Sequence, residues 1–182
     1  KKKLSGTRNG SKVIGVGVGQ AYHSAGSSGF DGLIRIMPNG KLHIHTGIGN
    51  VGTYSYASTS RVAAEVLGYD WNNCVIERGD SRKNLPWNLG QFGSNTSFTM
   101  SRTNYVAAVN AKEKLLEIAA MDLGGTTDQY ELSQERVVSK LDSSKFMTFA
   151  QASKRAIELG GKFSGQTVDK ELNPMTKTSV SR

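Results

Sequence analysis

Hydrophobic and polar residues alternate along two neighbouring segments, and this pattern predicts two strands. In residues 41–46, leucine and isoleucine alternate with lysine and histidine, as expected for a strand with one buried face. Residues 30–37 form the second predicted strand. Because the intervening Pro38-Asn39-Gly40 is typical of a hairpin turn, we expect the two strands to be antiparallel.

Three further segments have the apolar spacing of helices. The first covers residues 54–67 and ends at Gly68, with an apolar stripe formed by Thr59, Val62, Ala63, Val66 and Leu67. The second covers residues 101–123 and stops at a pair of glycines. The third opens with the capping box Thr148-x-x-Gln151 and is expected to run to Gly160-Gly161.

The remaining pattern sets the fold class. Strands are predicted at residues 12–19, 74–77 and, weakly, 134–141. Together the elements predict an α+β fold, in which an antiparallel or mixed sheet packs against helices as part of a larger domain. We expect residues 1–11 to be a flexible N-terminal segment, residues 12–160 the α+β domain, and residues 161–182 a polar segment that leads to sequence beyond this chain.

The two longer helices each follow a loop rich in Gly, Ser and Thr. We call residues 47–53 the first corner and residues 90–97 the second corner. A turn of this kind leaves backbone N–H groups at the positive end of a helix, where a phosphate binds by hydrogen bonds and by the helix dipole. The predicted binding residues are Gly49, Asn50, Val51, Gly52, Thr53, Gly93, Ser94, Asn95, Thr96 and Ser97.

One motif favours a different class of protein. Gly47-x-Gly49-x-x-Gly52 has the glycine spacing of Rossmann dinucleotide-binding domains, and Glu77 lies about where their ribose-binding acid is found. A first Rossmann strand is apolar throughout and lies inside a parallel sheet, whereas residues 41–46 alternate and have a hairpin partner. A Rossmann-type oxidoreductase therefore stays as an alternative only.

Composition excludes several kinds of site. The chain has 23 Lys and Arg against 15 Asp and Glu, but these form no basic stripe with interleaved aromatics, so we expect no nucleic-acid partner. Cys74 is the only cysteine, which excludes internal disulfides and cysteine-built metal sites. His43 and His45 share the outward face of their strand but lack a third ligand, so no metal site is predicted.

Other features bear on catalysis and location. The sequence has no Gly-x-Ser-x-Gly elbow, and we expect no catalytic residue within it; Asp80 is expected to order the following loop. No apolar run is long enough to span a membrane, and no signal peptide opens the chain. We therefore expect a cytoplasmic protein, with the periplasm as the alternative.

An ordered set of blocks over residues 13–159 resembles the molybdenum-binding subunit of the molybdenum hydroxylases, the family of xanthine oxidase, aldehyde oxidoreductase and carbon monoxide dehydrogenase. The blocks are Ile14-Gly15-Val16-Gly17, Pro38-Asn39-Gly40, residues 47–52, residues 61–68, Gly79-Asp80, and Gly93-Ser94-x-Thr96-Ser97 followed by an alanine-rich helix. The resemblance identifies residues 12–160 as a molybdopterin-binding domain.

The resemblance implies an oxidoreductase that takes oxygen from water and acts on an aldehyde, an N-heterocycle or a related substrate. Both corners would line the molybdenum cofactor, as molybdopterin or its cytosine dinucleotide. The implied partners are the remainder of the molybdenum subunit, an iron–sulfur subunit and, as a further option, a flavin subunit, with 2Fe-2S and FAD on partner domains or subunits.

The chain also departs from the family. Thr53 stands where the family usually has a glutamine that touches the cofactor. The family's catalytic glutamate and its glycine-rich loop near the metal fall outside the matched residues, so this chain by itself is expected to be inactive. A non-catalytic binding or assembly module remains the second alternative.

Overall fold

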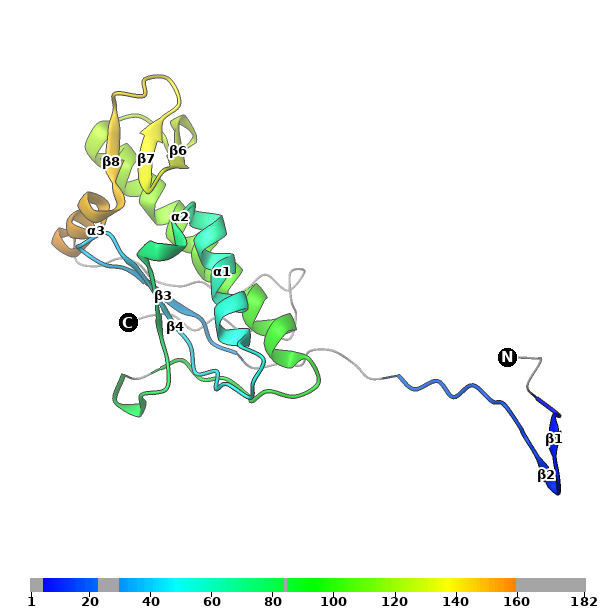
Figure 1. Ribbon diagram of the computed structural model, residues 1–182. Helices are drawn as coiled ribbons and strands as arrows, with labels where there is room; N and C mark the ends of the chain where they lie inside the picture. The colour runs from blue at the N-terminus through cyan, green and yellow to red at the C-terminus, as the bar shows by residue number, and fades with distance from the viewer. Residues whose placement is uncertain (1–4, 23–29, 84, 160–182) are drawn as a thin grey trace.

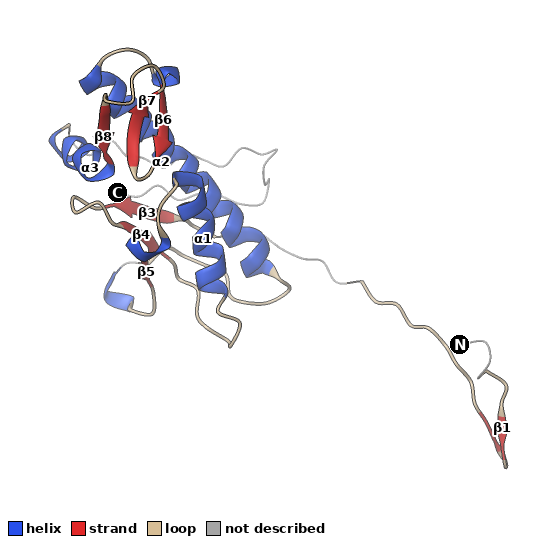
Figure 2. Ribbon diagram, turned by 45° about the horizontal axis from the view of Figure 1, so that its top comes forward, coloured by secondary structure: helices blue, strands red, loops and turns tan. Residues whose placement is uncertain are grey.

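The computed structural model describes residues 5–22, 30–83 and 85–159. Its body combines two three-stranded sheets with α-helices, and an arm formed by residues 5–22 extends away from that body (Figure 1). This architecture confirms the predicted α+β class. Figure 2 shows how the helices and the two sheets are grouped.

The central sheet has the strand order β3-β4-β5, and its middle strand leads into the first corner. Strands β3 (Leu33–Ile36) and β4 (Leu42–His45) are antiparallel, joined by the predicted turn, in which the Gly40 N–H donates to the Met37 carbonyl at 2.8 Å. Strand β5 (Cys74–Glu77) is parallel to β4. Because β4 has an antiparallel neighbour on its other side, it is not the first strand of a Rossmann sheet.

Helices α1 (Ser55–Leu67) and α2 (Ser101–Leu123) pack side by side and run in the same direction (Figure 1). Their apolar faces bury the sheet residues in one core, whose fully buried members include Leu42, Ile44, Ala63, Leu67, Ala108 and Leu115. Each fully buried leucine or isoleucine contributes about 1.5–3 kcal/mol relative to an exposed one. The shared direction places the N-terminal ends of both helices at the same end of the body.

Close approach of backbone to backbone fixes how α2 meets the sheet. A Cβ atom at Gly32, just before β3, would lie 2.6 Å from Thr103 Cγ2 on α2. The Asn104 side chain on α2 donates to the Thr59 carbonyl of α1 at 2.9 Å in a buried position. These contacts fix the position of α2 relative to α1 and to the start of β3.

The second sheet differs from the prediction of one weak strand over residues 134–141. It contains β6 (Tyr130–Ser133), β7 (Arg136–Ser139) and β8 (Phe146–Thr148), all antiparallel. The turn between β6 and β7 is made by Gln134 and Glu135, both in the left-handed region with φ of 50° and 58°. Hairpin turns of this shape normally carry Gly, Asn or Asp, so Gln134 and Glu135 did not indicate a turn.

Glu135 explains why this turn is tolerated. Its carboxylate accepts hydrogen bonds from the Asp70 N–H at 3.0 Å and from Asn73 Nδ2 at 2.8 Å. Asp70 and Asn73 belong to the connection between α1 and β5. The turn therefore ties the second sheet to the central one through contacts more than sixty residues apart in sequence.

Helix α3 (Phe149–Glu158) follows β8 and confirms the predicted capping box. The Thr148 hydroxyl accepts from the Gln151 N–H at 3.2 Å, and Gln151 Oε1 accepts from the Thr148 N–H at 2.8 Å. The helix ends at Glu158, and the predicted end at residues 160–161 lies outside the described residues. The polar segment 161–182 lies outside them as well.

The arm differs most from the sequence prediction. Strand β1 (Arg8–Asn9) pairs with β2 (Lys12–Val13), so a short hairpin crosses the boundary predicted at residue 11 between the N-terminal segment and the domain. The strand predicted over residues 12–19 ends at Val13. Beyond that point Gly15 and Gly17 have no atom within 4 Å of a Cβ position, because this segment has no neighbouring strand.

Candidate functional site

The first corner connects β4 to α1 through two residues in the left-handed region, Gly52 with φ 95° and Tyr54 with φ 52°. The side chain of Asn50 folds into this turn, and its Oδ1 accepts from the Gly52 N–H at 3.0 Å and from the Tyr54 N–H at 3.3 Å. The sequence predicted free N–H groups along this loop. Two of them are instead bonded to Asn50.

Other donors of the first corner remain available. Within the described part of the chain, no hydrogen-bond partner is recorded for the N–H groups of Val51 and Thr53, and both residues are exposed. A left-handed residue followed by a helical one aims successive N–H groups toward the same side, which is the geometry of backbone anion sites. The first corner therefore keeps the Val51 and Thr53 donors for a ligand, while Asn50 occupies the donors of Gly52 and Tyr54.

The second corner enters its helix in a similar way, through Gly93 with φ 54° and Ser94 with φ 53°. One π-helical turn, Thr96–Met100, then continues directly into α2. The predicted α-helix over residues 101–123 has the same bounds as α2, and the helical backbone extends upstream of it to residue 95. Asn95, Thr96 and Ser97 lie in the first helical turn and not in a loop.

Side chains in this turn divide into buried and exposed groups. Asn95 and Thr96 are buried, whereas Ser94 and Ser97 are exposed. Asn95 Oδ1 accepts from the Thr99 hydroxyl at 2.9 Å and so braces the turn. The Thr96 hydroxyl is buried and has no hydrogen-bond partner among the described residues. A buried hydroxyl without a partner costs free energy, so it is a candidate for a ligand contact.

The structure brings the two corners together. Gln91 Nε2 donates to the Ser55 hydroxyl at the start of α1, at 3.0 Å, and the Thr53 hydroxyl donates to the same oxygen at 3.3 Å. A Cβ atom at Gly49 would lie 3.4 Å from Gln91 Oε1. Neither Gln91 nor Ser55 was among the predicted binding residues, because no local pattern signals a contact across 36 residues.

Gly47 has a packing role. A Cβ atom there would lie 2.5 Å from the Pro86 carbonyl oxygen and 2.7 Å from Asn88 Oδ1. The loop that leads to the second corner is thus pressed against the first corner at this glycine. The first glycine of the Rossmann-like motif is needed for this close approach between two loops.

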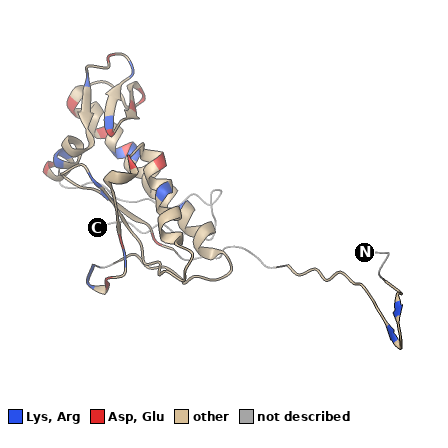
Figure 3. Cartoon of the chain, viewed as in Figure 1, with Lys and Arg blue, Asp and Glu red and all other residues tan. Residues whose placement is uncertain are grey.

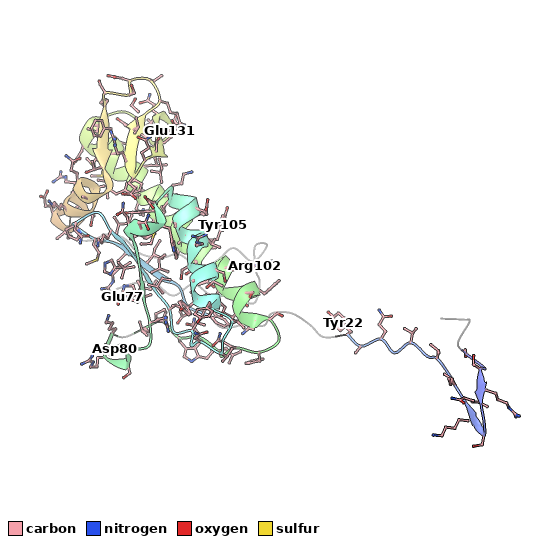
Figure 4. All side chains as sticks on the ribbon, viewed as in Figure 1. Tyr22, Glu77, Asp80, Arg102, Tyr105 and Glu131 are labelled. Atoms are coloured by element: carbon pink, nitrogen blue, oxygen red, sulfur yellow. The ribbon has the colours of Figure 1, made fainter. Side chains whose placement is uncertain are left out.

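Charged groups at the end of β5 form a short network beside the corners, where Figure 4 shows Glu77 and Asp80. Glu77 pairs with His43 Nδ1 at 3.0 Å and with Lys83, and the hydrogen bond from Lys83 is the main cause of the lowered pKa of Glu77. Asp80 accepts from the Arg82 N–H at 3.0 Å and pairs with its side chain, which confirms that it orders the loop.

His45 does not lie on an exposed face as predicted. Its side chain is buried, with 7% of the residue exposed, and neither ring nitrogen has a partner within the described residues. Burial lowers the pKa of His45, so the neutral ring is favoured. Among the described residues no group of three or more His, Cys, Asp and Glu side chains is placed to hold a metal ion.

With this geometry in place, comparison with known proteins decides the family. Residues 1–179 match the family described as the molybdopterin cofactor-binding domain. The chain belongs to this family. Because the match covers the arm, both corners and both sheets, the molybdopterin domain accounts for nearly the whole chain.

Two curated relatives agree with this assignment. The chain is 27% identical over 135 residues to the aldehyde oxidoreductase molybdenum-binding subunit PaoC of Escherichia coli O157:H7, covering 72% of this chain. It is 28% identical over 141 residues to the carbon monoxide dehydrogenase large chain of Afipia carboxidovorans, covering 77% of this chain. The matches span only 17% of the length of either relative.

Solved structures show the same fold. The Cu,Mo-CO dehydrogenase superposes with a TM-score of 0.62 at 26% identity, over 71% of this chain and 18% of that one. Quinoline 2-oxidoreductase from Pseudomonas putida 86 gives a TM-score of 0.56 at 20% identity, over 74% of this chain and 17% of that one, and supports the fold alone. In the described part of this molybdopterin domain, no helix has the length and apolarity to cross a membrane.

Proposed function

We propose that this molybdopterin domain is the cofactor-binding portion of a molybdenum hydroxylase, and that its two corners hold the pterin and phosphate groups of one cofactor together. The observation that carries the proposal is the contact between the corners, where Gln91 reaches Ser55 at the start of α1. Two donor-rich turns at the N-terminal ends of parallel helices then face one ligand, since both helix dipoles favour negative charge there.

The donor set of the corners fits such a ligand. The N–H groups of Val51 and Thr53 and the buried hydroxyl of Thr96 lack partners in the part of the chain that the structure describes. These neutral donors match the oxygens of a phosphate and the polar edge of a pterin. Basic and acidic side chains are spread along the chain and are not concentrated at the corners (Figure 3), so neutral donors carry the recognition.

The bound cofactor would supply an oxidation that adds a water-derived oxygen to an aldehyde, an N-heterocycle or a related substrate. The contribution of this chain is to bind and orient that group. Gly49 and Gly52 allow the cofactor to approach the backbone of the first corner closely, because neither residue has a side chain. Gly52 also adopts the left-handed conformation that this turn requires. Thr53 stands in place of the family's glutamine; its hydroxyl donates to Ser55, and its N–H is the donor proposed to face the cofactor.

The rest of the proposed enzyme lies outside this chain. PaoC is named a molybdenum-binding subunit and the carbon monoxide dehydrogenase protein a large chain, and each is several times longer than the region matched here. We propose that the remainder of the molybdenum subunit supplies the catalytic base. Clusters of the 2Fe-2S type and FAD are proposed to lie on partner domains or subunits.

Substitution of Gly49 tests the binding role. Its φ is not in the left-handed region and a Cβ would make an ordinary contact with Gln91, so Gly49→Ala should fold normally. The complete gene product carrying Gly49→Ala should lose most of its molybdenum and pterin without a change in melting temperature. Gly17→Ala, in the arm with no neighbouring atoms, is the matched control. Full cofactor content in the Gly49→Ala protein would contradict the proposal.

A further inference from the structure

We infer that Gln91 is a positioning residue that sets the distance between the two corners, so that both engage the same ligand. The inference rests on the proposed function, but it concerns a residue whose side chain bonds to another protein side chain. Gln91 is half-buried, lies in the second corner, and donates from its amide to Ser55, at the start of the helix that follows the first corner.

The bridge between the corners consists of Gln91, Ser55 and Thr53, with Ser55 in the middle. Ser55 is the first residue of α1 and is buried, with 7% of the residue exposed. Its carbonyl accepts from the hydroxyls of Ser58 at 3.1 Å and Thr59 at 2.8 Å, which fixes its backbone. Its hydroxyl accepts from both Gln91 Nε2 and Thr53 Oγ1. A shift of Gln91 is therefore transmitted to Thr53, a predicted binding residue.

The middle of the second corner depends on this hydrogen bond, because the other contacts that position the corner lie before and after it. Upstream, the Trp87 carbonyl accepts from the Asp31 N–H at 2.9 Å, and Asn88 forms a bridge with Phe30. Downstream, the π-helical turn is fixed to α2. Within the described residues, the hydrogen bond from Gln91 to Ser55 joins residues 89–94 to the start of α1, next to the first corner.

A neutral amide suits this place better than a charged side chain. It donates to Ser55 without adding a negative charge between two corners that are proposed to hold a phosphate. An amide at the end of two methylene groups also spans the gap at hydrogen-bond distance. Methionine has a similar length but cannot donate, so Gln91→Met removes the bond and keeps the bulk.

The first measurement uses hydrogen exchange in the cofactor-free 182-residue chain. Gln91→Met should speed exchange of the two hydrogen-bonded amides of this turn, Gly52 and Tyr54, about fivefold, the factor expected for loss of one hydrogen bond. Ser55→Ala should have at least this effect, because it also removes the Thr53 bond, and the double variant should be no worse than Ser55→Ala, whose loss already includes the Gln91 bond. Gln20→Met, in the exposed arm, is the matched control. Unchanged exchange of the Gly52 and Tyr54 amides would overturn the inference whatever the cofactor does.

The second measurement separates positioning from a purely structural role. In the complete gene product, Gln91→Met should lower cofactor affinity about fivefold and Ser55→Ala at least as much, and the double variant should be no worse than Ser55→Ala. Melting temperatures should stay within the range of the Gln20→Met control. Faster exchange with unchanged affinity would mean that the bridge serves only folding, and the inference would fail. If the unsubstituted protein holds no cofactor, the proposed function fails, whereas the exchange result still decides whether Gln91 couples the corners.

Discussion

The side chain of Asn50 occupies donors that an anionic ligand would use, and its replacement gives the sharpest test of the first corner. Its Oδ1 accepts from the N–H groups of Gly52 and Tyr54 at 3.0 and 3.3 Å. A ligand oxygen that takes this place must displace the amide. The two variants Asn50→Asp and Asn50→Ala should therefore change cofactor affinity in opposite directions.

The magnitudes follow from the geometry. Asn50→Asp puts a negative charge at a helix N-terminus, which should stabilise the cofactor-free chain by about 0.5 kcal/mol, a low value because Asn50 is exposed. The same charge would repel a phosphate bound in contact with it by about 1 kcal/mol in water. Together these terms lower affinity by about 1.5 kcal/mol, or roughly tenfold. Asn50→Ala removes bonds that the ligand must break and should raise affinity up to about fivefold.

Two assays measure these changes. Urea unfolding of the cofactor-free chain gives stability, and cofactor affinity of the complete gene product gives binding. The backbone of Asn50 is not in the left-handed region, so alanine introduces no strain there. Asn39 provides the control, because its Oδ1 accepts from the Lys41 N–H at 3.0 Å in an exposed turn away from the corners. If both Asn50 variants weaken binding, the side chain stays in place when the ligand binds and the reasoning is wrong.

Four further outcomes are expected. Thr96→Val should raise the stability of the cofactor-free chain by about 1 kcal/mol, since it removes a buried hydroxyl without a partner, yet lower molybdenum content; a drop in melting temperature would show that the hydroxyl is satisfied. Gly47→Ala should destabilise the chain by about 2 kcal/mol in urea unfolding, because its Cβ would overlap the neighbouring loop, and a neutral effect would mean that the loop moves freely. Gln134→Gly should stabilise it by about 0.5 kcal/mol by relieving a left-handed residue, unless the turn opens, which strand amide exchange would reveal. The folded-state pKa of His45 lies below its ordinary value of 6.5, so the unfolded chain takes up the proton first as pH falls. The free energy of unfolding should therefore decline between about pH 7 and pH 5. His45→Leu should lessen this decline in unfolding curves measured at both pH values.

Local patterns in the sequence determined most of the secondary structure. The hairpin at residues 38–40, the stop of α1 at Gly68 and the capping box at Thr148 were all predicted correctly, because each depends on turn chemistry or spacing within a few residues. The family resemblance also followed from ordered blocks along the chain. Both corners were located by the same means, as glycine-rich loops before helices.

Tertiary structure decided how those corners are built. The contact of Gln91 with Ser55 crosses 36 residues, and the contact of Glu135 with Asn73 crosses 62. The burial of His45 likewise depends on what covers its sheet face, and strand alternation alone predicted the opposite. Composition and periodicity carry no information about such pairs, because a hydrogen bond between distant segments leaves no local signal. The sequence by itself determined which elements form, and only the folded chain determined which side chains meet between them.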